Sequence, residues 1–372
     1  MAYAAPTAAQ QNMRDYNSQS QPPAVSAPMV VPGNQGGGGT TLELPSSGIV
    51  HQNQANIPPA QPPQQDLTIP SRQLRDQAGY QQVTVTVTQP NGSYVTDLQK
   101  QDFKLYMDGQ QRPIEFFRQD LNTPVSVGIL VDTSGSMEPK LPQARAAISE
   151  FLRNLNDRDD VFLFAFSGRP FKLQDFTEDH ALVQSRLGLL HAYGSTSLYD
   201  AVVTGLVMLQ RGRYDKRALL VVTDGMDNTS SHSLDDVVAL ARRQGVLIYS
   251  IGIGDPNASP IGIAIGPFSI GGEGDEVDVK TLRMLSTETG AKTYNVRVVG
   301  DGGALRNACS EISRELRQQY TVGFLAPDPG AGGYRSLHVD VPTHPGVDVR
   351  VRKGVEVGSR PAAGSAYAGS PY

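Results

Sequence analysis

Two carboxylates and three hydroxyls occur at points where a folded chain can bring their oxygens together. Asp132, Ser134 and Ser136 alternate with other residues directly after an apolar run. Asp224 follows a second apolar run, and Thr196 comes just before a predicted helix. Such oxygen donors suit a hard divalent cation, Mg²⁺ or Mn²⁺, rather than Zn²⁺ or Cu²⁺. The residue types therefore predict a divalent metal site.

The apolar runs that precede the acids are nearly continuous, which is typical of strands covered on both faces. These runs occupy residues 125–131, 161–166, 218–222 and 246–251. Segments with one apolar face alternate with them, and such segments are typical of helices. The alternation predicts a doubly wound α/β fold with a mostly parallel sheet, whose carboxyl edge is where such folds bind ligands. Asp132 and Asp224 are expected at that edge.

The two flanks of this region show strict alternation of apolar and polar residues instead. Val83, Val85 and Val87 alternate with threonines in the first flank, and Tyr320, Val322 and Phe324 alternate with other residues in the second. Period-two alternation is typical of half-buried strands. Neither flank has enough strands to enclose a core, so we predict that both contribute to one small β-sandwich.

Composition marks the ends of the chain. Residues up to about 65 are rich in Gln, Pro, Ala, Ser and Gly, and the final residues are similar. Such segments bury too little apolar surface to offset the entropy of folding. The predicted organisation is a disordered tail at 1–65, sandwich strands at 66–123, the α/β domain at 124–319, more sandwich strands at 320–357 and a disordered tail at 358–372.

The candidate metal residues resemble the metal-ion-dependent adhesion site of the von Willebrand factor type A family. Asp132, Ser134 and Ser136 match the Asp-x-Ser-x-Ser element of that site. Thr196 matches the single threonine that the family places before a helix, and Asp224 matches the Thr-Asp-Gly element. The order of strands and helices over about 195 residues matches too. The flanks are similar to those of bacterial secreted-type relatives, in which the module is embedded in β structure.

The resemblance implies a Rossmann-like fold that functions by binding a protein partner. One metal position would stay open to water, and an Asp or Glu carboxylate of a protein partner would fill it. It also favours an extracytoplasmic or secreted setting, although the N-terminus shows neither the basic region nor the apolar stretch of a secretory signal.

Neighbouring polar residues have simpler interpretations. Ser195 and Ser197 are expected to make loop hydrogen bonds, and Asp227 is expected in a solvated turn or in contact with a metal ligand.

The long segment 253–276 leaves the same edge of the sheet. It either shapes the partner surface or is a passive insertion.

Other function classes fit less well. A structural scaffold stabilised by its metal remains open as the alternative. A Mg²⁺-dependent hydrolase with Asp132 as nucleophile is less favoured, because Ser134 stands where an acid would be needed. A dinucleotide enzyme would need GxGxxG, and the Gly252-Ile253-Gly254 stretch lacks the third glycine. We predict that the protein is not an enzyme.

Composition excludes further partners. The formal charge is -5 and no cluster of Lys and Arg occurs, which argues against nucleic acid. No apolar stretch approaches the roughly 18 residues of a membrane span. Cys309 is the single cysteine, so an intrachain disulfide is impossible, and we expect it to be a small buried apolar residue.

Overall fold

The structure is a computed structural model that describes residues 72–75, 77–254, 263–265, 268–270, 278–297, 303–326 and 333–357. The predicted tails at 1–65 and 358–372 lie outside these residues. Most of segment 253–276 does too. Its described part is its first two residues and an antiparallel pair of short strands, β10 (Ile263–Ile265) and β11 (Phe268–Ile270). Its proposed role in partner binding therefore stays a prediction.

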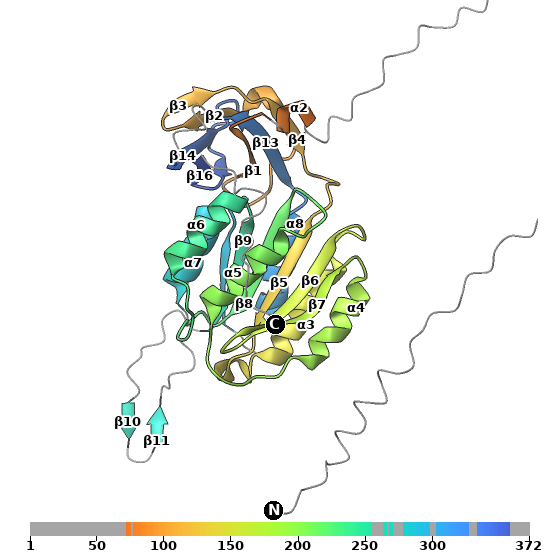
Figure 1. Ribbon diagram of the computed structural model, residues 1–372, viewed down its shortest axis with the longest axis vertical. Helices are drawn as coiled ribbons and strands as arrows, with labels where there is room; N and C mark the ends of the chain where they lie inside the picture. The colour runs from red at the N-terminus through yellow and green to blue at the C-terminus, as the bar shows by residue number, and fades with distance from the viewer. Residues whose placement is uncertain are drawn as a thin grey trace, which may run out of the picture. The chain divides into compact units, whose positions relative to one another are not determined.

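Six of the described strands form a central, mostly parallel sheet in the order β12-β9-β8-β5-β6-β7 (Figure 1). They are β5 (Ser126–Asp132), β6 (Asp160–Phe166), β7 (Pro170–Thr177), β8 (Arg217–Thr223), β9 (Leu247–Ile253) and β12 (Thr293–Val296). β5 pairs in parallel with β6 and β8, whereas β7 is antiparallel to β6. Every residue of β5, β6 and β9 is buried, which confirms that the continuous apolar runs are strands covered on both faces.

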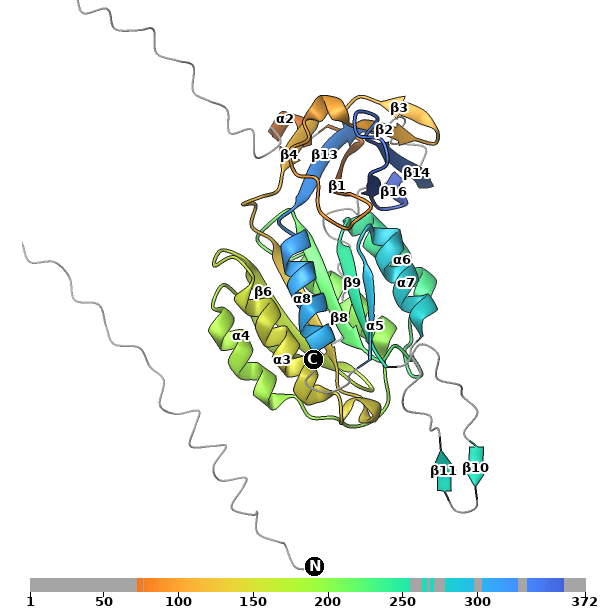
Figure 2. The same ribbon diagram turned by 180° about the vertical axis from the view of Figure 1, so that it is seen from behind.

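Helices cover both faces of this sheet. They are α3 (Leu141–Arg153), α4 (His180–Arg186), α5 (Leu198–Leu209), α6 (Leu234–Gln244), α7 (Val279–Thr289) and α8 (Gly303–Glu315). The apolar residues of α3, α4 and α8 pack with one face of the sheet, and those of α5, α6 and α7 pack with the other (Figures 1 and 2). The predicted doubly wound α/β fold is therefore confirmed.

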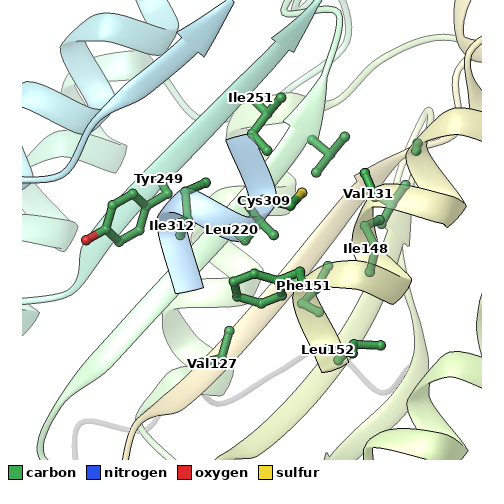
Figure 3. Packing of buried hydrophobic residues seen from close by; sticks show 14 of the residues in the cluster. Val127, Val131, Ile148, Phe151, Leu152, Leu220, Tyr249, Ile251, Cys309 and Ile312 are labelled. Carbon is green, nitrogen blue, oxygen red and sulfur yellow. The ribbon is translucent and has the colours of Figure 1, made fainter. Parts of the chain in front are cut away.

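The larger of the two core clusters joins α3 and α8 to the middle of the sheet (Figure 3). Phe151 and Ile312, from the two helices, are in contact with this cluster, as is Val127 of β5. Cys309 is fully buried in it, and burial raises the pKa of its thiol to about 12. The expectation of a buried apolar cysteine is confirmed.

The flanks form two four-stranded antiparallel sheets, in the orders β15-β1-β13-β4 and β16-β14-β2-β3. Their strands are β1 (Tyr80–Thr88), β2 (Lys104–Met107), β3 (Gln110–Arg112), β4 (Phe116–Gln119), β13 (Gln319–Leu325), β14 (Gly333–Asp340), β15 (Asp348–Arg350) and β16 (Gly354–Val357). Both sheets mix strands from the two flanks, and they share one apolar core. This is the predicted β-sandwich.

A buried ion pair ties the sandwich to the α/β domain. Lys216 precedes β8 and its ammonium lies 2.8 Å from the carboxylate of Asp120, which follows β4. Neither side chain is more than 1% exposed. The same ammonium donates a hydrogen bond to the carbonyl oxygen of Leu316, in the connection between α8 and β13. The junction is therefore held by charge as well as by chain connectivity.

Of the helices in the described part of the chain, none has the length and apolar character needed to cross a membrane.

The helix ends follow local sequence signals. Ser233 caps α6 and exchanges hydrogen bonds with Asp236 in a capping box, and Gly245 ends the helix in the left-handed conformation, with a φ of 65°.

Candidate metal centre

The first metal-site element begins where β5 ends. The side chain of Asp132 is fully buried, and its Oδ1 accepts a hydrogen bond of 2.8 Å from the backbone N–H of Ser134. Its Oδ2 accepts a bond of 2.6 Å from the hydroxyl of Thr223. The Oγ atoms of Ser134 and Ser136 lie 3.2 Å apart, and Ser136 is exposed. One acid and two hydroxyls thus reach from the core to the surface.

The second acid enters from the neighbouring strand. Asp224 follows β8, which pairs in parallel with β5, so the two strands end side by side. Its side chain is buried, and Gly225 turns the chain away with a φ of 93°. The ammonium of Lys140, just before α3, lies 3.4 Å from Asp224 Oδ2. The predicted meeting of the two acids at the carboxyl edge is observed.

The electrostatics of the pair indicate a shortage of positive charge. Burial, and after it the negative charge of Asp224, raise the pKa of Asp132 to about 6. Hydrogen bonds from Thr223 and Ser134 oppose both effects without cancelling them. A cation between two buried carboxylates would stabilise the ionised form of Asp132.

Backbone contacts bring the loop of Thr196 against the first element. The N–H of Tyr193 donates a hydrogen bond of 2.8 Å to the carbonyl oxygen of Thr133. The N–H of Gly135 donates a hydrogen bond of 3.1 Å to the carbonyl oxygen of Gly194. Thr196 itself is buried, and its N–H donates to the side-chain carbonyl of Asn228 at 2.9 Å. The hydroxyl-bearing loop is therefore held between the two loops that carry the acids.

The neighbouring serines are engaged in the loops themselves. The Ser197 hydroxyl is buried and donates to the carbonyl of Ser167 at 2.8 Å. The Ser195 hydroxyl lies 3.5 Å from that of Thr229. Asp227 is half-buried and accepts hydrogen bonds from the N–H groups of Tyr199 and Ser230, which ties its turn to the start of α5.

The donor set fits a hard divalent cation. All five candidate side chains offer oxygen, and Mg²⁺ and Mn²⁺ prefer oxygen ligands. Among the described residues, no group of three or more His, Cys, Asp or Glu side chains could hold a metal ion. A metal in this part of the chain would accordingly depend on hydroxyls in addition to the two acids.

Sequence reasoning missed three contributors. Lys140 places a positive charge beside Asp224, and its signal in the sequence was only its position eight residues after Asp132. Thr223 is the threonine of the Thr-Asp-Gly element, and its hydroxyl donates a hydrogen bond to Asp132. Asn228 lies four residues beyond Asp224 and binds the backbone of Thr196, a contact that depends entirely on loop folding.

The profile of the von Willebrand factor type A domain matches residues 126–306. Residues 126–306 are a von Willebrand factor type A (VWA) domain. This finding confirms the resemblance and the fold that it implied. VWA domains are protein-interaction modules of adhesion type, and that general function applies to this part of the chain.

The relatives include two bacterial proteins. An uncharacterized protein of Borreliella burgdorferi is 26% identical over 188 residues, which cover 47% of this chain and 55% of that protein. A UPF0353 protein of Mycolicibacterium paratuberculosis is 24% identical over 231 residues, which cover 57% of this chain and 65% of that protein. The matches thus span less than two thirds of either relative.

A solved structure of a conserved hypothetical protein, BatB from Bacteroides thetaiotaomicron, is also similar. It is 21% identical, with a TM-score of 0.41. The alignment covers 51% of this chain and 98% of the BatB chain.

Proposed function

We propose that this VWA domain binds Mg²⁺ or Mn²⁺ through Asp132, Ser134, Ser136, Thr196 and Asp224, and uses the cation to capture an Asp or Glu side chain of a protein partner. The observation that carries the proposal is the burial of two mutually repelling carboxylates at one edge of the sheet. A cation would remove the repulsion.

The mixture of charged and neutral donors supports capture of an anion. Three of the five donors are hydroxyls, which contribute no negative charge, so a bound divalent cation keeps much of its attraction for a further carboxylate. Ser136 is exposed whereas Asp132 is fully buried, so the site is accessible from the surface on the serine side.

Exposed apolar side chains beside the site support a protein as the partner. Tyr193 is 56% exposed and precedes the loop of Thr196, and Met226 is 46% exposed and follows Asp224 by two residues. Aromatic and methionine side chains are enriched in protein interfaces. They would contact apolar groups next to the captured carboxylate.

Titration calorimetry tests the metal site directly. Mg²⁺ and Mn²⁺ are titrated into the EDTA-treated full chain, and we expect saturable binding that is lost in an Asp132→Ala, Asp224→Ala double variant. Asp235→Asn is the matched control, because Asp235 is an exposed acid in the first turn of α6. Absence of binding in the parent up to millimolar metal would overturn the proposal.

A second experiment separates partner capture from a structural metal. The alternative is a scaffold that the bound metal stabilises without engaging a partner. Bound Mn²⁺ that keeps a water molecule in an open coordination position enhances the relaxation of water protons. A peptide whose Asp carboxylate displaces that water should reduce the enhancement. A scaffold site would raise the melting temperature with metal but would show no effect of the peptide.

A further inference from the structure

A cavity of about 310 Å³ lies at the opposite edge of the sheet from the metal loops, because it contacts the start of β8 whereas Asp224 follows the end of β8. Its described lining is strongly basic. It contains five cationic side chains and one acid, namely Arg75, Lys216, Arg217, Arg243, Arg352 and Asp215. An adjoining cavity of about 890 Å³ shares Arg75, Asp215 and Lys216 with it.

Arg352 is the most buried arginine of this lining, with 6% of its surface exposed. Its Nη1 donates to the carbonyl of Arg242 and its Nη2 to the carbonyl of Gln82, both at 3.0 Å. Among the described residues, its Nε is buried without a hydrogen-bond partner. Burial lowers the pKa of this guanidinium to about 10, and no acid opposes the effect.

Arg217 adds a second incompletely paired guanidinium. It is half-buried at the start of β8, and its Nε is buried without a partner. Burial lowers its pKa, and the charges of Asp215 and Asp160 oppose this effect only in part. Lys216, in contrast, is committed to Asp120. The charge left without a counterion in this lining therefore comes from arginines.

We infer that this cavity binds a small oxyanion, either inorganic phosphate or the phosphoryl group of a small organic phosphate. Guanidinium groups offer several N–H donors in a plane, which suits phosphate oxygens. The five cationic side chains of the lining outnumber its one acid, so an anion in the cavity meets a net positive charge. A volume of about 310 Å³ accommodates a small molecule. The inference does not depend on the proposed metal function.

The test is calorimetry on the full chain in EDTA at constant ionic strength, with inorganic phosphate and glycerol 3-phosphate as separate probes. We expect saturable binding that Arg217→Gln and Arg243→Gln each weaken about tenfold, because each removes one charge-assisted contact. Neither variant touches the buried Arg352, so both should fold, which circular dichroism checks. Arg283→Gln is the control, because Arg283 is an exposed arginine of α7 outside the lining.

Tighter binding of glycerol 3-phosphate would support the inference and assign an organic phosphate, and equal or tighter binding of inorganic phosphate would support it and assign the free ion. The inference is overturned if neither probe binds at 10 mM, on the order of the weakest useful affinity. It is also overturned if the Arg217→Gln, Arg243→Gln double variant binds as well as the parent, or if Arg283→Gln weakens binding equally.

Discussion

Lys140 holds its ammonium 3.4 Å from the carboxylate of Asp224, and both side chains are more than 90% buried. A positive charge of the protein thus occupies part of the electrostatic role that the proposed metal would have. The ammonium and the cation would both be attracted to Asp224, but they repel each other.

Replacing Lys140 with Met should therefore strengthen Mg²⁺ binding. We expect the dissociation constant to fall about tenfold, because one nearby like charge is removed and the effective dielectric constant of a partly buried site is well below that of water. Calorimetry of Lys140→Met against the parent measures the change. Lys280→Met, which removes an exposed lysine of α7, is the control. Weaker Mg²⁺ binding in Lys140→Met would mean that Lys140 positions Asp224 for the metal.

Two serines of the site region should separate metal binding from stability. Ser136→Ala removes an exposed hydroxyl of the donor set, so Mg²⁺ affinity should fall about tenfold while the free energy of unfolding changes by less than about 0.5 kcal/mol. Ser197→Ala removes the buried hydroxyl that donates to Ser167, so it should cost about 1 kcal/mol and leave Mg²⁺ affinity unchanged.

Calorimetry and urea unfolding of both serine variants give the two quantities. If Ser197→Ala lost the metal and Ser136→Ala kept it, the assignment of the two hydroxyls would be reversed.

A side chain at Gly128, in the middle of β5, should destabilise the protein. A Cβ there would lie 2.6 Å from Leu219 Cδ1 and would also clash with the ring of Phe162. We expect Gly128→Ala to lower the free energy of unfolding by about 2–3 kcal/mol through overpacking. Gly205→Ala in α5 is the matched control, since its Cβ would lie 3.0 Å from the same Leu219 atom.

In the Gly205 variant, the higher helix propensity of Ala offsets much of the strain, so its stability should change by less than about 1 kcal/mol. Urea unfolding compares the two variants. Equal losses in both would show that the sheet relaxes around Gly128.

The junction between the sandwich and the VWA domain should depend on Lys216. Lys216→Met leaves the buried Asp120 with one cationic partner fewer, and we expect a loss of about 3–5 kcal/mol. The exposed pair of Lys292 and Glu311 is the control, and Lys292→Met should cost less than about 1 kcal/mol. Urea unfolding at pH 7 measures both, and similar small losses would contradict the prediction.

The same variant should change the response to acid. Burial raises the pKa of Asp120, but Lys216 and Arg118 outweigh it and hold this pKa below the ordinary value of 3.8. The ionised Asp120 therefore stabilises the parent above pH 3.8 and loses that effect only as pH falls through its lower folded-state pKa. In Lys216→Met the folded-state pKa rises, so acid unfolding should begin at a higher pH. An unchanged acid midpoint would contradict this.

Several features of the protein were predictable from local patterns. The buried strands of the central sheet were readable because parallel strands covered on both faces need continuous apolar residues. The meeting of Asp132 and Asp224 followed from topology, since the carboxyl ends of adjacent parallel strands share one edge. Strands β7 and β12 were missed, because their partial burial leaves neither a continuous run nor an alternation.

Pairings between distant segments required the tertiary structure. Alternation in each flank predicted strands, but only the fold places Tyr80 opposite Leu325 and interleaves both flanks in each sheet. The sequence predicts the candidate metal donors because their oxygen-bearing side chains follow a short local motif. It does not indicate the burial of Lys140 beside Asp224, or of Arg352 without an acid, because a side chain's charge environment depends on residues brought near it only by packing.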